Sequence, residues 1–324
     1  MTLRDPPGDR SPAALLPFGL VNLDKPPGPS AHQVAEWVRE LTRDALADRA
    51  ATADPADTGG GLDSESPAEL VERVAHAGTL DPKVTGSLPL MLGDATRLAQ
   101  VFDDAVKEYV AVLELHGPPP SDFTAIVAEF EGEIYQKPPR KSAVKRQLRV
   151  REIFDLTVLE RDGRKALLRI RCESGTYIRK LCHDLGLALG TGAHMGDLRR
   201  TATGTFDDTT LVTMEEFTDA LRFWIEDDDA DPLRDVVDPA ERALVTLPRV
   251  TIAPSAAREV AEGAPVYAPG VIDVADAEKG AATPTDGPLV ACYTPNGSAV
   301  CIGRLVGSPD AEQGTVVDLE RVLV

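Results

Sequence analysis

The sequence predicts an α+β fold with a mixed, largely antiparallel central sheet, followed by a small β-barrel domain near its C-terminal end. Helical and strand patterns intermix without a repeated strand–helix–strand unit. The 324 residues exceed what one hydrophobic core usually holds. After Leu247, short apolar runs are broken by glycine and proline. We therefore expect a flexible tail over residues 1–17, a main domain over 18–245 and a second domain over 246–324.

The main domain begins with a predicted strand over residues 19–23, which ends in the proline- and glycine-containing turn 24–28. Ser30 and Gln33 have the spacing of a capping box, so a helix should begin there. Its apolar face carries Val34, Trp37, Val38 and Leu41 at helical spacing. Residues 44–66 are acidic, rich in glycine and poor in apolar side chains, which predicts a disordered insertion.

Further along, two segments alternate apolar side chains in the manner of half-buried strands, residues 109–115 and 167–172. Residues 122–130 are predicted to form a short helix between them. A further helix should end at Gly190, because apolar residues line one of its faces: Ile178, Leu181, Cys182, Leu185 and Leu189. In the second domain, residues 266–271 and 289–293 are predicted strands, and residues 273–287 an exposed polar loop.

The charge distribution points to a nucleic-acid partner despite an acidic total of -19. Residues 137–200 hold 16 Lys or Arg against 7 Asp or Glu, so one basic segment lies within an acidic chain. Clustered cations of this kind bind phosphates. Acidic surfaces elsewhere are typical of proteins from organisms with high internal salt, which is our hypothesis for this chain.

Other classes of protein are disfavoured by composition. No stretch reaches the roughly 20 apolar residues that span a bilayer, and no apolar signal segment opens the chain, so we expect a cytoplasmic protein with no membrane partner. The four cysteines, Cys172, Cys182, Cys292 and Cys301, have neither zinc-site spacing nor the density of a disulfide scaffold. No metal site is predicted.

One carboxylate is flanked by residues that restrict the backbone. Asp81 follows Gly78 and precedes Pro82, and Gly86 closes the same loop. Such a loop can hold a side chain in a fixed place, as positional catalysis requires. An isolated Asp-Pro is more often an ordinary turn. The case for Asp81 therefore depends on the surrounding motifs.

Residues 78–86, Gly-Thr-Leu-Asp-Pro-Lys-Val-Thr-Gly, resemble the catalytic motif of the TruB and dyskerin family of pseudouridine synthases. The resemblance extends over about residues 19–204. Residues 19–30 resemble the family's first motif, and Arg199-Arg200-Thr201 resembles its last. Lys-Glu-Tyr at 107–109 and Glu-Ser-Gly-Thr-Tyr-Ile-Arg at 173–179 resemble the motifs that supply two tyrosines and an arginine. The resemblance implies a pseudouridine synthase fold and an isomerisation that needs no cofactor.

The resemblance also implies roles for particular residues. Asp81 would be the catalytic carboxylate, and Arg179 would keep it ionised. Tyr109 would contact the flipped uracil, and Tyr177 would pack around Asp81. Lys25 would support the catalytic loop and Leu198 would wall the uracil pocket. The predicted RNA contacts are His76, Lys25, Lys137, Arg140, Lys141, Lys145, Arg146, Leu198, Arg199 and Arg200.

The loop between Gln136 and Arg151 is short, and with Cys-His-Asp-Leu-Gly at 182–186 it looks like the archaeal and eukaryotic dyskerin type. That type works in an H/ACA ribonucleoprotein, where a guide RNA pairs with the target and small protein subunits assist. Residues 263–271 resemble a PUA domain, which implies guide contacts near Gly263 and Gly270. The substrates would be rRNA, tRNA or both.

Three alternatives to a guided enzyme stay open at this point. A guide-independent enzyme could modify the tRNA T-arm directly. A non-catalytic RNA-binding scaffold could hold the subunits of a particle together, although intact Asp81, Tyr109 and Arg179 argue against it. A hydrolase using Asp81 is disfavoured further, because no second carboxylate, histidine base or metal set accompanies it at recognisable spacing.

Overall fold

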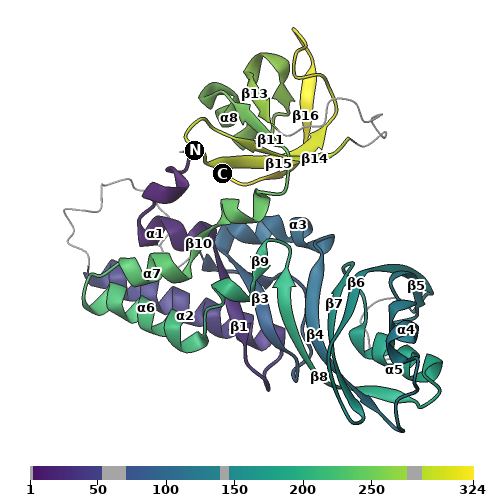
Figure 1. Ribbon diagram of the computed structural model, residues 1–324. Coiled ribbons are helices and arrows are strands. Elements are labelled where there is room, and N and C mark those ends of the chain that lie inside the picture. Colours follow the sequence, from purple (N-terminus) through teal and green to yellow (C-terminus); the bar gives the residue numbers. More distant parts are fainter. Residues whose placement is uncertain (1–2, 53–70, 139–145, 276–286) are drawn as a thin grey trace.

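The computed structural model describes residues 3–52, 71–138, 146–275 and 287–324. Two sheets dominate it, a ten-stranded sheet in the main domain and a six-stranded sheet in the second domain. Figure 1 shows how the two domains are arranged. Within the large sheet, only β3 and β8 pair in parallel, and the remaining pairs are antiparallel. The predicted α+β class with a mixed, largely antiparallel central sheet is confirmed.

The strand order of the large sheet is β10-β1-β3-β8-β4-β7-β6-β5, with β2 beside β3 and β9 beside β8. Its strands are β1 (Gly19–Lys25), β2 (Val74–His76), β3 (Thr85–Leu92), β4 (Lys107–Leu115), β5 (Gly132–Gln136), β6 (Arg149–Asp162), β7 (Lys165–Cys172), β8 (Ala193–Thr203), β9 (Phe206–Asp207) and β10 (Asp238–Pro239). The central place of β3, β8 and β4 brings residues from distant parts of the chain together.

Helices pack along the large sheet in two groups. Near β1 and β3 lie α2 (Ala31–Thr52), α6 (Met214–Glu226) and α7 (Asp231–Val236), whereas α4 (Phe123–Ala128) and α5 (Ile178–Ala188) lie near β4 and β6. The shorter elements are η1 (Pro7–Asp9), α1 (Pro12–Leu15), η2 (Leu16–Phe18), η4 (Gly93–Leu98), α3 (Ala99–Asp103), η5 (Asp208–Thr210) and η6 (Ala240–Leu244). No helix within the described residues is both long and apolar enough to cross a bilayer.

The helix-covered face of the large sheet holds the main core. Strand β4 alternates buried and half-buried residues along its whole length, as its sequence predicts. Tyr109, Ala111 and Leu113 point to the helix-covered face, and Leu198 of β8 joins the same apolar cluster. Since side chains alternate along a strand, Arg200 leaves β8 on this face and Arg199 leaves it on the other.

The second domain has the strand order β12-β16-β15-β14-β11-β13. Its elements are β11 (Arg249–Ile252), α8 (Pro254–Ala261), β12 (Val266–Tyr267), η7 (Ala268–Gly270), β13 (Val271–Ala275), β14 (Leu289–Tyr293), β15 (Ala299–Leu305) and β16 (Thr315–Val322). A shared apolar cluster joins the two domains, with Phe18 and Leu20 from one and Tyr293 and Leu323 from the other.

The predicted flexible tail over residues 1–17 is wrong for the described residues 3–17. Arg10 is buried and donates two hydrogen bonds to the Glu241 carboxylate, at 2.8 and 2.6 Å. The hydroxyl of Ser298 also accepts a bond from Arg10. The segment is ordered because a buried guanidinium needs these partners, which lie far along the sequence.

Three other sequence predictions need correction. Helix α2 continues to Thr52, so the predicted insertion 44–66 begins too early; Ala45 and Leu46 are buried, and alanine-rich sequence favours a helix. Residues 268–270 form a 3₁₀ turn within the predicted strand 266–271. Part of the predicted loop 273–287 is strand β13. The remainder of the insertion, residues 53–66, and residues 276–286 lie outside the described residues.

Candidate active site on the helix-covered face of the large sheet

Asp81 lies in the loop between β2 and β3 and is exposed. Its carboxylate pairs with the guanidinium of Arg179, the second residue of α5. The two side chains are 55% and 62% exposed. The structure therefore brings together two predicted residues that are 98 positions apart in the chain.

The loop around Asp81 is held from below by Lys25, which is fully buried at the end of β1. Its ammonium donates hydrogen bonds to the carbonyl oxygens of Pro82 at 3.1 Å and Val84 at 2.9 Å. The Gly28 amide donates to the Pro82 carbonyl at 2.8 Å. Lys25 thus supports the loop of Asp81, as expected, and the RNA contact predicted for it stays a prediction.

Arg200 holds both ends of the same loop. Its Nη2 donates to the carbonyl of Gly78 at 3.1 Å and its Nε to the carbonyl of Ser87 at 2.8 Å. Only 1% of Arg200 is exposed. Its guanidinium is bonded to carbonyls inside the protein, and the RNA contact predicted for Arg200 stays a prediction.

Gly86 permits this close approach. A Cβ on Gly86 would lie 2.2 Å from the Arg200 carbonyl oxygen, and its φ of +97° is a conformation that other residues rarely adopt. Register explains the contact, since Gly86 and Arg200 are paired residues of β3 and β8. Glycine at this position is a geometric requirement of the site.

Tyr109 lies beside Arg200 on the helix-covered face and is largely buried. Burial raises the pKa of the Tyr109 phenol, and a hydrogen bond with the Arg200 guanidinium acts in the opposite direction. The phenol therefore stays protonated near neutral pH. Its predicted contact with uracil stays a prediction.

Tyr177 precedes α5, and Gln136 at the end of β5 fixes its backbone. The Tyr177 amide donates to Oε1 of Gln136 at 2.8 Å, and Nε2 of Gln136 donates to the Tyr177 carbonyl at 3.2 Å. Arg179 follows two residues later. The two hydrogen bonds thus set the start of the helix that presents Arg179 to Asp81.

His76 lies on β2 before the catalytic loop. Burial lowers the pKa of its imidazole, and the Arg200 charge acts in the same direction. Its buried Nδ1 has no hydrogen-bond partner among the described residues. A neutral imidazole suits stacking and hydrogen bonding, so the predicted nucleotide contact stays a prediction.

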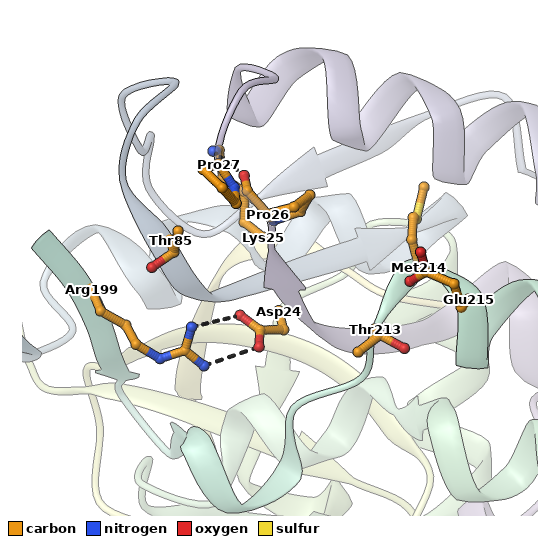
Figure 2. A pocket seen from close by; sticks show the side chains of 9 residues that line it. All are labelled: Asp24, Lys25, Pro26, Pro27, Thr85, Arg199, Thr213, Met214 and Glu215. Atoms are coloured by element: carbon orange, nitrogen blue, oxygen red, sulfur yellow. Dashed lines mark hydrogen bonds and ion pairs between the residues drawn. The ribbon is translucent and has the colours of Figure 1, made fainter.

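Arg199 lies on the opposite face of β8 and forms a two-bond pair with Asp24, with both N···O distances at 3.0 Å. The pair borders a pocket of about 260 Å³, seen in Figure 2. Figure 2 draws Thr85 on the same side as Arg199 and residues 213–215 across from them, with Lys25, Pro26 and Pro27 between. Asp81 is not among the residues that line this pocket, but Lys25 and Thr85 place it next to the loop of Asp81.

The other predicted RNA contacts are mostly on the surface or outside the described residues. Lys137 and Arg146 are exposed beside the loop that follows β5, and Arg146 donates to the Pro138 carbonyl at 3.2 Å. Arg140, Lys141 and Lys145 lie outside the described residues. Leu198 is buried on the site's face. Gly263 has a φ of +97°, and Gly270 lies against Ala256.

Sequence reasoning missed three residues that build the site: Gln136, Ser174 and Lys107. Ser174 accepts a hydrogen bond from the Lys107 ammonium at 2.9 Å. Lys107 and Ser174 do lie within recognised motifs, which was a usable signal. Gln136 carried no such signal beyond its place at the start of the short loop.

Comparisons with known proteins agree with this geometry. A family model described as "TruB family pseudouridylate synthase (N terminal domain)" matches residues 68–122 and 118–178. A model described as "tRNA pseudouridylate synthase B C-terminal domain" matches residues 179–245. Two relatives named "Probable tRNA pseudouridine synthase B" are similar over the whole chain. The Haloarcula marismortui protein is 62% identical, with 94% of it covered, and the Halobacterium salinarum protein is 59% identical and fully covered.

Solved structures give the same result. The chain resembles one in "Crystal Structure of a Cbf5-Nop10-Gar1 Complex" with a TM-score of 0.84 and 39% identity, covering 99% of this chain and 90% of that one. It resembles one in "Structure of H/ACA RNP bound to a substrate RNA containing 2'-deoxyuridine" with a TM-score of 0.82 and 37% identity, at the same coverage.

Proposed function

Because the chain belongs to the TruB family of pseudouridine synthases, we propose that Asp81 is the carboxylate that carries the isomerisation of uridine to pseudouridine in RNA. The observation that carries this proposal is the ion pair between Asp81 and Arg179 at an exposed, firmly held loop. The loop is held by Lys25 and Arg200, so the carboxylate is preorganised.

The reaction breaks the bond from C1′ to N1, rotates the base and joins C1′ to C5. It requires an ionised carboxylate near the ribose and the base, acting as a nucleophile or a proton acceptor. Asp81 supplies such a carboxylate, and its ion pair with the Arg179 guanidinium orients it at the loop. Attack at C1′ and attack at C6 both fit this arrangement.

The remaining residues receive the target nucleotide. The uridine must leave its stack, and an aromatic or apolar surface lowers the cost of exposing it. Tyr109 and Leu198 lie on the same face of adjacent strands and would bound the uracil, with Tyr177 packed beside Asp81. His76 and the exposed Lys137, Arg146 and loop cations would contact the RNA strand.

We further propose that the enzyme acts within an H/ACA ribonucleoprotein, where a guide RNA selects the uridine in rRNA or tRNA. The short connection between β5 and β6 supports this, as does the likeness to chains from complexes with Nop10, Gar1 and substrate RNA. Small protein subunits of the same kind would be its partners. The second domain, with Gly263 and Gly270, would act as a PUA domain that holds the guide.

A guide-independent tRNA enzyme is the second candidate, and the names of the relatives favour it. Reconstitution with and without a guide RNA and partner proteins separates the two. Mapping of pseudouridine in rRNA and tRNA should show modification that depends on the guide. Equal activity without a guide would overturn the particle assignment.

The variant Asp81→Asn tests the catalytic assignment. It should abolish pseudouridine formation and leave RNA binding within about twofold, because the amide cannot act as the charged carboxylate. Asp24→Asn is the matched control, since Asp24 also pairs with an arginine but lies on the other face. Residual activity in Asp81→Asn would show that Asp81 is not the catalytic carboxylate. If the wild-type particle is active and the same particle with Asp81→Asn is not, the chain is not a non-catalytic scaffold.

Location and salt complete the proposal. We propose a cytoplasmic enzyme adapted to high salt, in line with the charge of -19 and with relatives from Haloarcula and Halobacterium. Cell fractionation tests the location. Activity and solubility measured against KCl concentration test the salt adaptation, and maxima at low salt would overturn it.

A further inference from the structure

Lys107 is a buried cation that the mechanism above does not use. It begins β4, and 5% of it is exposed. Its ammonium donates hydrogen bonds to the carbonyls of Phe102 and Ala105 and to the hydroxyl of Ser174, each at 2.9 Å. Among the described residues no carboxylate lies within ion-pair distance of it. Burying a charge costs free energy that pairing and hydrogen bonding offset, and Lys107 has only the hydrogen bonds.

The side chain of Lys107 lies between two parts of the active site. Ser174 belongs to the turn that leads to Arg179, and the Thr176 hydroxyl closes that turn on the Glu173 carbonyl. On the other side, the Lys107 Cε would lie 3.6 Å from a Cβ on Gly78, where the catalytic loop begins. Lys107 is therefore hydrogen-bonded to the segment that presents Arg179 and lies beside the residue at which the loop of Asp81 begins.

Several charged or titratable groups face Lys107. They are Arg200 on β8, Cys172 on β7, Asp103 at the end of α3 and Asp104 after it. Burial and then the Arg200 charge lower the pKa of Lys107 to about 8, although the two aspartates and Cys172 act the other way. Burial raises the pKa of the Cys172 thiol to about 12, so Cys172 remains neutral.

We propose that Lys107 is a positioning residue for the isomerisation, whose ammonium holds the turn at Ser174, and with it Arg179, in register with Asp81. The proposal rests on the roles given above to Asp81 and Arg179. Loss of the Lys107 proton leaves an amine with two N–H donors for three acceptors. One hydrogen bond then loses its donor, and the other two become neutral bonds, which are about half as strong. Arg179 then meets Asp81 less often in the productive geometry, and turnover falls.

The test compares the wild type with Lys107→Met between pH 7 and pH 9.5, in the full chain assembled with guide RNA and partner proteins. At pH 7 the variant should have about 30-fold lower kcat with KM within about twofold, as expected for lost positioning. The ratio of wild type to variant should shrink to about twofold at pH 9.5, as Lys107 itself loses its charge. Taking this ratio at each pH cancels the ionisation of uridine.

Two further variants serve as controls. Lys107→Arg retains the charge at every pH tested, so the ratio of the wild-type kcat to the kcat of this variant should fall above pH 8. If Lys107→Met does not fold, this comparison tests the proposal. Lys165→Met removes an exposed lysine that pairs with Glu114 and should match the wild type at every pH. A ratio that stays constant from pH 7 to pH 9.5 for both Lys107 variants overturns the proposal.

The pH dependence of the free energy of unfolding distinguishes a positioning role of Lys107 from a purely structural one. The pKa of Lys107 is lower in the folded chain than in the unfolded chain, so between about pH 8 and 10.5 the unfolded state binds more protons at this site. The contribution of Lys107 to stability therefore rises with pH in this window, while activity falls. Parallel loss of both would overturn the proposal. Full activity in Asp81→Asn would instead refute the proposed function, whatever the Lys107 ratios show.

Discussion

Arg199 and Arg200 are consecutive residues of β8, yet their side chains lie on opposite faces of the sheet and differ in exposure and in bonding partners. Arg199 is partly exposed and forms a two-bond pair with Asp24 beside the pocket of Figure 2. Arg200 is buried and bonds the carbonyls of Gly78 and Ser87 together with the Tyr109 phenol. The charge of Arg199 is therefore neutralised, whereas that of Arg200 is not.

The difference shows how a site for an anionic substrate can be built inside an acidic protein. Lys25, Lys107 and Arg200 are buried around the catalytic loop, and none of them forms an ion pair within the described part of the chain. Their charges act over a short distance in a medium that screens poorly. They make the electrostatic potential around the loop of Asp81 more positive, which suits the binding of an anionic RNA backbone.

The largest loss of stability should come from Gly86→Ala, because the added methyl group would push β3 away from β8, the strand that carries Arg199 and Arg200. The new methyl group would clash with the Arg200 carbonyl at a positive φ, so the free energy of unfolding should fall by about 4 kcal/mol. Gly132→Ala is the control, because its φ of +99° is similar and nothing lies within 4 Å. That variant should lose only about 1 kcal/mol in chemical denaturation. Equal losses would show that strain, and not close approach, explains Gly86.

Replacement of each arginine by methionine tests the comparison directly. Arg200→Met should lower the free energy of unfolding by about 3 kcal/mol, because two buried carbonyls and a phenol lose their donor. Pseudouridine formation should fall at least as steeply, since the loop of Asp81 loses both anchors. Arg199→Met should cost about 1 kcal/mol or less. Thermal unfolding and kcat are the measurements. Equal changes in Arg199→Met and Arg200→Met would contradict the proposed difference between the two arginines.

Local pattern predicted much of this molecule from its sequence. The hydroxyl of Ser30 and the side chain of Gln33 form the predicted capping box, and β4 alternates as its apolar residues require. Both features depend on neighbours within a few positions. The Asp81 and Arg179 pair was predictable for another reason, because each residue stands in a recognisable motif.

The buried cations were not predictable in the same way. A lysine or arginine in a sequence is usually interpreted as a surface residue. Only the structure shows that Lys25 and Arg200 are buried, because their hydrogen-bond acceptors are carbonyls of a loop distant in sequence. Arg10 is similar, since Glu241 lies 231 positions away. Long-range pairing decides burial for these side chains, and periodicity carries no information about it.

The smallest expected effect belongs to Asp24→Asn, which removes the charge that neutralises Arg199. The pair is 29% and 38% exposed, so the free energy of unfolding should fall by about 0.5 kcal/mol at low salt. At 1 M KCl the Debye length is about 3 Å, and the difference from the wild type should vanish. Melting measured across KCl concentrations checks this, with activity expected to stay within about twofold. A salt-independent loss would mean that Asp24 holds Arg199 through shape and hydrogen bonding, and the two faces of β8 would then differ less than their charges indicate.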